Sequence, residues 1–224
     1  MAKKIFTNQI DEKSLVLLSL YFFQPILIFW GLTKTPINFE FVISPFIYLV
    51  AVLISLFLLL LFNKQIFKER TDQSIYLATA LVGNTGNLGI PLGIALFGVE
   101  SVPYTSIINI ANTLFIYVFS VYFFAREKFL LKDAILAIFK IPGIWFAILA
   151  LIINYNGITI DKSISIALEM GAYTSIIIQL VIFGIYLYNV KIKSMPWHLS
   201  LHISFVKHIL LQIGRASCRE RVSS

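Results

Sequence analysis

Long apolar runs separated by short polar breaks fill most of the chain. Runs such as those over residues 44–62 and 134–153 extend for about 20 residues with at most one charge each, the length that a helix needs to cross a hydrocarbon core of roughly 30 Å. The pattern predicts six such helices and a seventh that begins near His198. The six cover residues 14–32, 44–62, 74–97, 103–124, 134–153 and 164–188. Pro142 lies inside the fifth run, so this helix either kinks at the proline or begins there.

The composition is typical of a membrane protein. Hydrophobic residues make up 58% of the chain and charged residues 13%, with a mean hydropathy of +0.87. A soluble domain is about half apolar and about a quarter charged. The sequence therefore predicts an all-α, polytopic transmembrane helix bundle of about six or seven spanning helices, surrounded by the lipid of the plasma or inner membrane.

The positive charges follow a regular order along the chain. Lys and Arg gather before the first predicted helix and after the second, fourth and sixth, whereas the intervening loops hold Lys34, none, and Lys162. Short loops rich in Lys and Arg stay in the cytoplasm, so the N-terminus as given is expected there. The net charge of +7 thus reflects the placement of loops, and no nucleic-acid partner is expected.

One predicted helix contains a polar stretch, LVGNTGNLGIPLGIALFG, from Leu81 to Gly98. In hydrocarbon every backbone polar group needs an internal partner, so a helix interrupted by proline and clustered glycine is tolerated only inside protein or beside a wet cavity. Pro91 has no N–H to donate to residue 87, and its ring clashes with that carbonyl group. The sequence therefore predicts that the helix opens around Pro91 and leaves carbonyl groups free near Asn87.

An opened helix offers binding groups to a solute. It presents free carbonyl groups on one side and the positive end of a half-helix on the other, which suits an anion or a coupling ion. Asparagine and threonine side chains add donors and acceptors without burying a charge. The alternative is close helix packing, because Gly89 and Gly93 form a small-xxx-small pair. The candidate substrate-binding residues are Asn84, Thr85, Gly86, Asn87, Gly89, Pro91, Asn109 and Asn112.

Asn109 and Asn112 belong to this set because they lie on one face of the next apolar helix. Polar groups inside such a helix need partners and often mark a pathway. A structural hydrogen bond between helices would also explain them. Their place next to the interrupted helix favours a role in lining the site.

A few other polar residues lie in or near the apolar runs. Gln24 and Pro25 either line a cavity or kink their helix. Glu169 is either a proton-coupling carboxylate or, as favoured here, a residue at the membrane interface. His198 and His202 could face one metal ion, but a third ligand is not evident, which favours an interfacial polar patch. Neither a metal nor a cofactor is therefore expected.

The polar stretch also resembles a known family motif. GNTGNLGIPL, from Gly83 to Leu92, is similar to the motif G-N-T-G-x-x-G-[IL]-P-[IL] of the auxin efflux carrier family, and IINIANTLFIYVFS is similar to its following helix, with Asn109 and Asn112. This family of secondary transporters includes plant auxin exporters and bacterial permeases for malate or other organic anions. The resemblance implies ten helices in two inverted repeats, with the fourth and ninth broken and crossing near the midplane.

Set against this family plan, the chain is expected to be a fragment. The first family helix would precede Met1, and the last helices, including the ninth, would follow the chain. Residues 1–212 are therefore expected to form a partial transporter domain, namely the first repeat without its first helix and the start of the second. Residues 213–224 read IGRASCRERVSS, which resembles translated sequencing-adapter DNA; the alternative is a native basic tail.

The expected function is a secondary active transporter, or permease, that moves a small organic anion such as a carboxylate by alternating access. Coupling to a proton, to a sodium ion or to the membrane potential stays open, as does a homodimeric state. An enzyme is not expected, because the sequence has no G-x-S-x-G, no H-E-x-x-H and no paired intramembrane aspartates. The alternative is a membrane-embedded ligand-binding sensor or a structural bundle without transport.

Overall fold

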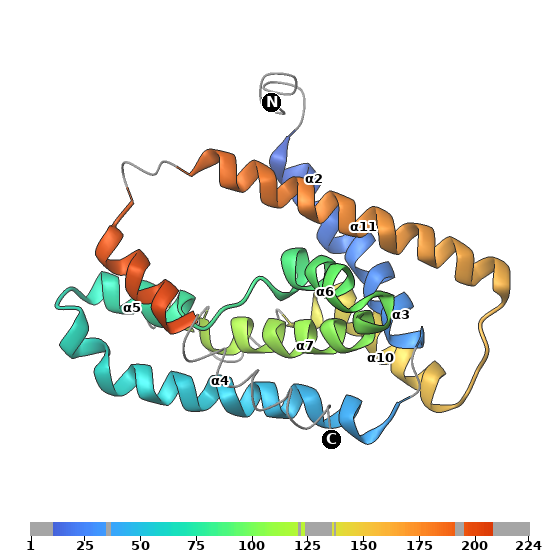
Figure 1. Cartoon of the computed structure of the whole chain (residues 1–224), viewed down its shortest axis with the longest axis horizontal. Coiled ribbons are helices and arrows are strands. Elements are labelled where there is room, and N and C mark those ends of the chain that lie inside the picture. The colour runs from blue at the N-terminus through green and yellow to red at the C-terminus, as the bar shows by residue number, and fades with distance from the viewer. Residues whose placement is uncertain are drawn as a thin grey trace. The chain divides into compact units, whose positions relative to one another are not determined.

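The computed structural model describes residues 11–34, 37–120, 122–123, 136, 138–190 and 195–207 (Figure 1). Almost all of these residues are helical, and the described ranges contain no strand. The predicted all-α fold is therefore confirmed. The adapter-like segment, residues 213–224, lies outside the described residues.

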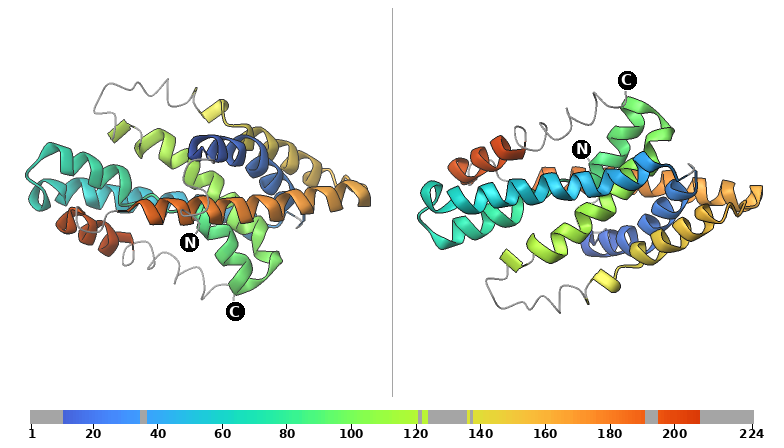
Figure 2. Two further views of the ribbon diagram at one scale, coloured as in Figure 1. Left: turned by 90° about the horizontal axis from the view of Figure 1, so that it is seen from above. Right: turned by 90° about the horizontal axis from the view of Figure 1, so that it is seen from below.

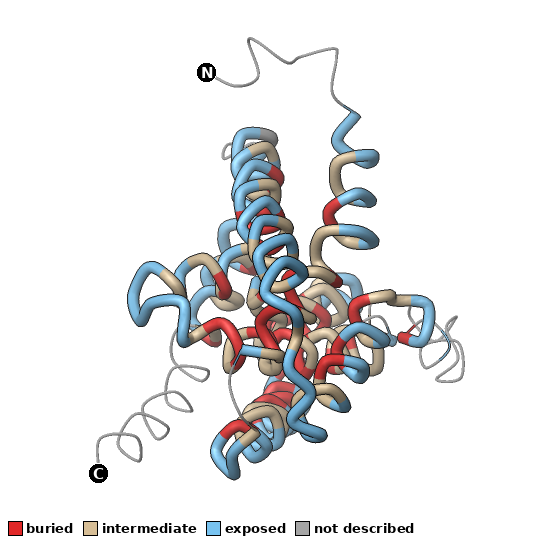
Figure 3. Tube along the Cα trace, turned by 90° about the vertical axis from the view of Figure 1, so that its right-hand side faces the viewer, coloured by how far each residue is buried: buried red, intermediate tan, exposed pale blue. Residues whose placement is uncertain are grey.

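Within these ranges, four helical segments are long and apolar enough to cross a membrane. They are Glu12–Lys34, Phe39–Ile66, Val99–Ser120 and Lys162–Tyr188. In Phe39–Ile66 and Lys162–Tyr188, only 22% of the most apolar window is buried, and Figure 3 shows exposed positions along the helices in pale blue. Large apolar side chains such as Phe46 and Phe57 are exposed, which suits contact with lipid.

The other two predicted spans are shorter than expected. Residues 74–97 were predicted as one helix, but they divide into α5 (Arg70–Thr79), the π-helical turn η2 (Thr85–Gly89) and α6 (Ile90–Phe97). The fifth helix, α10 (Pro142–Tyr155), begins at its proline, which confirms the second of the two alternatives for this run. Proline is favoured at a first helical position because its missing N–H has no intrahelical partner there. The predicted seventh helix is present over residues 197–207.

The helix α4 (Phe39–Ile66) begins before the predicted position and runs through Pro45. Its start is set by Asn38, whose side-chain Oδ1 accepts a hydrogen bond from the Phe41 N–H at 2.7 Å. An asparagine at this position satisfies one of the N–H groups that a helix start leaves unpaired. Pro45 lies in the second turn of the helix, where it has no N–H for an i→i−4 bond, and α4 nevertheless continues past it.

The chain divides into two compact units. Unit 1 comprises Met1–Val42, Asn84–Ile110 and Phe139–Val190, and unit 2 comprises Ile43–Gly83, Ala111–Ile138 and Lys191–Ser224. Along the chain, unit 2 gives way to unit 1 at the peptide bond between Gly83 and Asn84, inside the polar stretch. The helix α7 (Val102–Phe115) contributes residues to both units.

In unit 1, α3 (Gln24–Lys34) packs against both α10 and α11 (Lys162–Asn189) (Figures 1 and 2). The Asn154 Nδ2 near the end of α10 donates to the Leu32 carbonyl oxygen at 2.6 Å, so the C-terminal ends of α3 and α10 lie together. This agrees with the charge pattern, which places both ends on the non-cytoplasmic side. The core of this unit includes a buried cluster made of Leu27, Trp30, Ile90, Val102, Ala172 and Ile176.

In unit 2, the ring of Phe67 joins three segments. It lies 4.9 Å from the ring of Tyr76 in α5, and 5.4 Å and 5.5 Å from the rings of His198 and His202. Leu199 and Val206 belong to the same buried cluster as Phe67 and Tyr76. The helix of residues 197–207 therefore packs alongside α5 by way of this cluster.

Wide π-helical turns precede two of the prolines. In η1 (Ser19–Phe23) the Gln24 N–H donates to the Ser19 carbonyl group, and in η2 the Gly89 N–H donates to that of Asn84 at 2.9 Å. A turn closed by such i→i−5 bonds is wider than an α-helical turn, so the carbonyl group that a following proline ring would strike can lie farther away. Pro25 is fully buried in this setting.

Candidate binding site at the interrupted helix

The interruption lies upstream of its predicted position. After α5 ends at Thr79 the chain turns, and Val82–Asn84 has no regular structure; Asn84 itself has φ −83° and ψ 63°. The prediction of an opening around Pro91, with free carbonyl groups near Asn87, was therefore wrong in its location. Pro91 lies in the first turn of α6, directly after the wide turn η2, so its missing N–H does not break the helix there.

Asn112, in unit 2, holds the backbone at the interruption. Its Nδ2 donates to the Gly83 carbonyl oxygen at 3.0 Å, and its Oδ1 accepts from the Tyr48 hydroxyl group at 2.7 Å. The side chain is only 2% exposed. The interruption leaves the Gly83 carbonyl group without an intrahelical donor, and the Asn112 side chain supplies the partner that a backbone polar group in hydrocarbon needs.

Asn109, in unit 1, binds the first turn after the interruption. Its Oδ1 accepts a hydrogen bond from the Thr85 hydroxyl group at 2.8 Å. A Cβ atom added to Gly86 would lie 3.1 Å from the same oxygen, closer than side chains normally approach. A side chain at residue 86 would therefore require the Asn109 amide to move by a few tenths of an ångström.

Asn84 and Asn87 differ from these buried residues. Asn84 is exposed and Asn87 is partly exposed. Among the residues that the structure describes, neither side-chain amide has a hydrogen-bond partner, although the Asn84 backbone carbonyl accepts from the N–H groups of Leu88 and Gly89. These two amides are therefore available to a ligand.

The two glycines of the close-packing alternative behave differently. A Cβ atom on Gly89 would make only ordinary contacts, the nearest at 3.5 Å to the Asn84 carbonyl oxygen. A Cβ atom on Gly93 would lie 2.8 Å from Cγ2 of Thr105. Close packing of α6 on α7 therefore explains Gly93, whereas it does not explain the polar residues at positions 84–87.

The segment η2–α6 forms a continuous half-helix from Thr85 to Phe97. It ends at Gly98, whose φ of 79° favours glycine over other residues. The first N–H groups of a helix have no intrahelical partner, and the helix dipole makes this end partially positive. The exposed amides of Asn84 and Asn87 therefore lie at an end that attracts anions.

A family model described as "membrane transport protein" matches residues 1–131, a range that includes the interrupted helix and the two asparagines of α7. The chain belongs to the membrane transport protein family. This confirms the resemblance to auxin efflux carriers and makes the chain a membrane transporter with several membrane passes; the cell membrane is the usual location of this family. Neither the curated proteins nor the solved structures gave a significant match.

His198 and His202 of this membrane transport protein lie against an aromatic side chain. Their ring centroids are 4.5 Å apart, and both rings pack edge-on against Phe67. His202 Nδ1 lies 2.9 Å from the His198 carbonyl oxygen. In the described part of the chain, no three His, Cys, Asp or Glu residues are grouped so that they could hold a metal ion.

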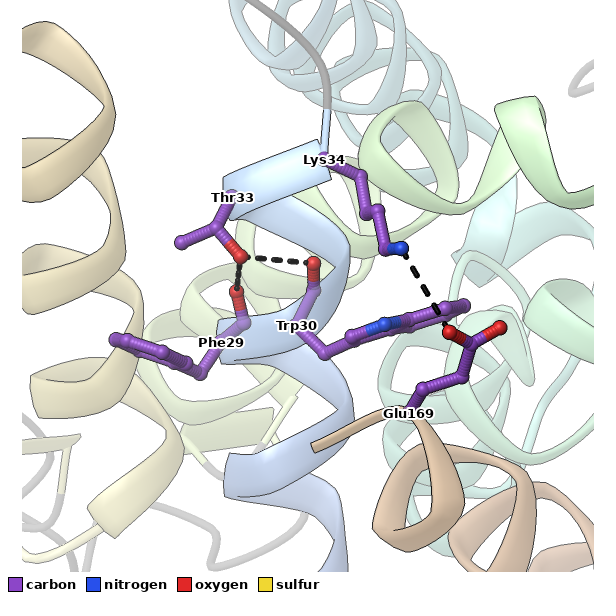
Figure 4. A network of polar contacts seen from close by, with 5 residues as sticks. All are labelled: Phe29, Trp30, Thr33, Lys34 and Glu169. Atoms are coloured by element: carbon purple, nitrogen blue, oxygen red, sulfur yellow. Dashed lines mark hydrogen bonds and ion pairs between the residues drawn. The ribbon is translucent and has the colours of Figure 1, made fainter. Parts of the chain in front are cut away.

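Glu169 forms an ion pair with Lys34. The Lys34 Nζ lies 3.7 Å from a Glu169 carboxylate oxygen and 5.3 Å from the centroid of the Trp30 ring (Figure 4). The two charged side chains are 41% and 38% exposed. Lys34 ends α3 and Glu169 lies in an early turn of α11, so the pair fits an interfacial position.

Tyr48, the partner of Asn112 in unit 2, was missed by the sequence analysis. Tyr48 carries a hydroxyl group inside an apolar run, and a buried tyrosine hydroxyl usually needs a partner, which was an available signal. Ser175 and Gln179 are fully buried on α11, the helix that packs against η2, and Gln179 Nε2 donates to Ser175 Oγ at 3.1 Å. Their position beside η2 depends on long-range packing.

Proposed function

We propose that this membrane transport protein moves a small organic anion, such as a carboxylate, by alternating access, and binds it at the start of η2. The observation that carries the proposal is the half-helix that begins after an interruption, with the unpaired amides of Asn84 and Asn87 at its positive end. Interrupted membrane helices of this kind bind substrates in several transporter folds.

The chemistry at this end favours a carboxylate. Backbone N–H groups at a helix start point outward and donate to anions, and the helix dipole adds to the attraction. The Asn84 and Asn87 amides can donate further hydrogen bonds without burying a charge when the substrate is absent. A neutral site of this kind can both bind and release an anion, as transport requires.

The other candidate residues have positioning roles in this proposal. Thr85 and Asn109 fix the first turn of η2, and Gly86 makes room for the Asn109 amide. Asn112 holds the backbone before the interruption by way of Gly83. Gly89 and Pro91 shape the passage from the wide turn into α6.

Uptake by the purified protein in sealed liposomes tests the proposal, with radiolabelled succinate and benzoate as probes. We expect N84A and N87A to lower uptake about tenfold or more each, the effect of losing one hydrogen bond to a charged group. N156A is the matched control, because Asn156 is an exposed asparagine at the end of α10. Wild-type uptake in both variants would contradict the site.

The same liposomes distinguish the remaining alternatives. Binding of a probe without uptake would support the sensor alternative. Imposed proton, sodium or electrical gradients, each dissipated in turn by a selective ionophore, would show whether a proton, a sodium ion or the membrane potential drives transport.

A further inference from the structure

A fully buried amide on α11 has one polar atom without a partner. Gln179 is 0% exposed, and its Nε2 donates to Ser175 Oγ at 3.1 Å, but its Oε1 has no hydrogen-bond donor among the described residues. At 1.5 Å per residue, Gln179 lies about 15 Å further along α11 than the interfacial Glu169, near the middle of a hydrocarbon core of roughly 30 Å. An unpaired carbonyl group at this depth is costly and needs an explanation.

The two side chains lie in the middle of the buried stripe of α11. With 3.6 residues per turn, they point between Gly171 on one side and Ile176 on the other. Gly171 touches α3, since a Cβ atom added to it would lie 2.9 Å from Cγ2 of Ile26. Ile176 belongs to the same buried cluster as Ile90, which directly follows η2. The pair is therefore buried where α3 and η2 flank α11, and all three elements belong to unit 1.

The free groups of this pair are neutral oxygen atoms. An amide Oε1 only accepts, and a serine Oγ that accepts one hydrogen bond keeps a second lone pair. Neutral oxygens of this kind bind alkali-metal cations in membrane proteins, where unwound helices add backbone carbonyl groups. The two π-helical turns η1 and η2 both contact α11, and such turns are frequent at functional sites. A divalent ion would favour carboxylates, and Glu169, the one acidic residue of α11, is far along the helix.

We propose that Gln179 Oε1 and Ser175 Oγ bind an alkali-metal cation in unit 1. Its link to transport rests on the proposed function, because α11 packs against η2, whose start binds the anion. Opposite charges attract strongly in surroundings of low dielectric constant. By thermodynamic linkage the cation raises the affinity for the anion, and the anion raises the affinity for the cation to the same extent. An alkali-metal ion is therefore the coupling ion.

Thermal unfolding of the purified protein in detergent tests the cation site without any substrate. NaCl and KCl are compared with choline chloride at equal ionic strength. We expect at least one of the two metal ions to raise the unfolding temperature by about 2–4 °C, because a ligand that binds only the folded state stabilises it. The gluconate salts should act as the chlorides do. Equal unfolding temperatures in the metal and choline salts, or a shift that follows chloride, would overturn the inference.

Variants of α11 locate the site. Q179L should lose the shift caused by the metal ion, and in choline chloride it should unfold at the wild-type temperature or above, because it no longer buries an unpaired oxygen. S175A should reduce the shift. T174A is its matched control, since Thr174 is exposed and its hydroxyl group donates to the Met170 carbonyl oxygen of the same helix at 2.8 Å. A full shift in Q179L, or a lower unfolding temperature of Q179L in every salt, would overturn the assignment of Gln179 as a ligand.

Calorimetric titration with succinate tests the link to the substrate in the wild-type protein. We expect succinate to bind several-fold more tightly in the salt of the stabilising metal ion than in choline chloride. Equal affinities would overturn the coupling role. Succinate binding without any shift by a metal ion would overturn the cation site and leave the proposed anion site intact. A shift by a metal ion without succinate binding would contradict the proposed function alone.

Discussion

Asn112 donates a hydrogen bond to the carbonyl oxygen of Gly83, 29 residues earlier in the chain, at 3.0 Å. The same amide accepts from Tyr48, so both of its ends are engaged by the protein. The structural hydrogen bond that the sequence left open as an alternative is therefore present. Asn112 thus supplies a hydrogen-bond donor to the Gly83 carbonyl group, which the interruption of the helix leaves without an intrahelical partner.

Replacing Asn112 by alanine should destabilise the protein by about 1–3 kcal/mol, because the Gly83 carbonyl group then loses its side-chain partner. Y48F removes one hydrogen bond and keeps the contact between Asn112 and Gly83, so it should cost about 0.5–1.5 kcal/mol. Chemical or thermal unfolding in detergent measures both effects. If N112A cost no more than Y48F, the bond to Gly83 would not be important for stability.

Replacing Gly86 by alanine should destabilise the protein. In G86A the new Cβ would start 3.1 Å from Oδ1 of Asn109, which Thr85 holds in place. We expect a loss of about 1–3 kcal/mol in unfolding free energy, typical of overpacking. N109A removes the obstructing amide, so the double variant should lose less than the sum of the two single variants.

Gly184 provides the matched control for this substitution. It lies inside α11 with no atom within 4 Å of an added Cβ. G184A should therefore be neutral or stabilise the protein by up to about 1 kcal/mol, because alanine loses less conformational entropy in a helix than glycine does. Equal effects of G86A and G184A would mean that the contact with Asn109 does not constrain residue 86.

The sequence predicted the long apolar helices well, because local hydropathy determines them. It predicted an interrupted helix as well, but placed the opening at Pro91 instead of Val82–Asn84. Proline chemistry shows where an N–H group is missing, yet a wide turn upstream accommodates that loss. The position of the interruption also depends on Asn109 and Asn112, whose partners lie 24 and 29 residues away.

The same limit applies to the candidate site. Residue type alone placed Asn84, Thr85, Asn109 and Asn112 in one group of polar residues. The structure distinguishes them, because Thr85, Asn109 and Asn112 are engaged in side-chain hydrogen bonds whereas the Asn84 amide has no partner among the described residues. Which amides have partners depends on tertiary packing, and no local pattern reports it.

Asp161 should make the start of α11 sensitive to acid. Its carboxylate accepts a hydrogen bond from the Ser163 N–H at 2.8 Å, and this bond lowers the pKa of Asp161 below its usual value of 3.8. A carboxyl group with a lowered pKa in the folded state stabilises the protein above the unfolded pKa, and this contribution is lost as the pH falls through the folded pKa.

The variant D161N keeps an acceptor at the helix start but cannot titrate. Unfolding temperatures measured from pH 6 down to pH 3 should therefore fall more steeply for the wild type than for D161N once the pH drops below about 4. Parallel curves for the two proteins would show that the Asp161 charge does not contribute to stability.

Glu169 tests whether an acidic residue near the membrane couples transport to protons. Its partner Lys34 lies at 3.7 Å, and both side chains are more than a third exposed, so water screens the pair. E169Q should therefore lower the unfolding free energy by less than about 1 kcal/mol, and K34M should have a similar effect. We expect E169Q to leave both the rate of uptake and its dependence on pH unchanged, because an interfacial ion pair has no part in moving a proton across the membrane. Loss of a pH-driven component of uptake in E169Q, but not in K34M, would instead assign Glu169 the proton-coupling role, since only E169Q removes the titratable carboxylate.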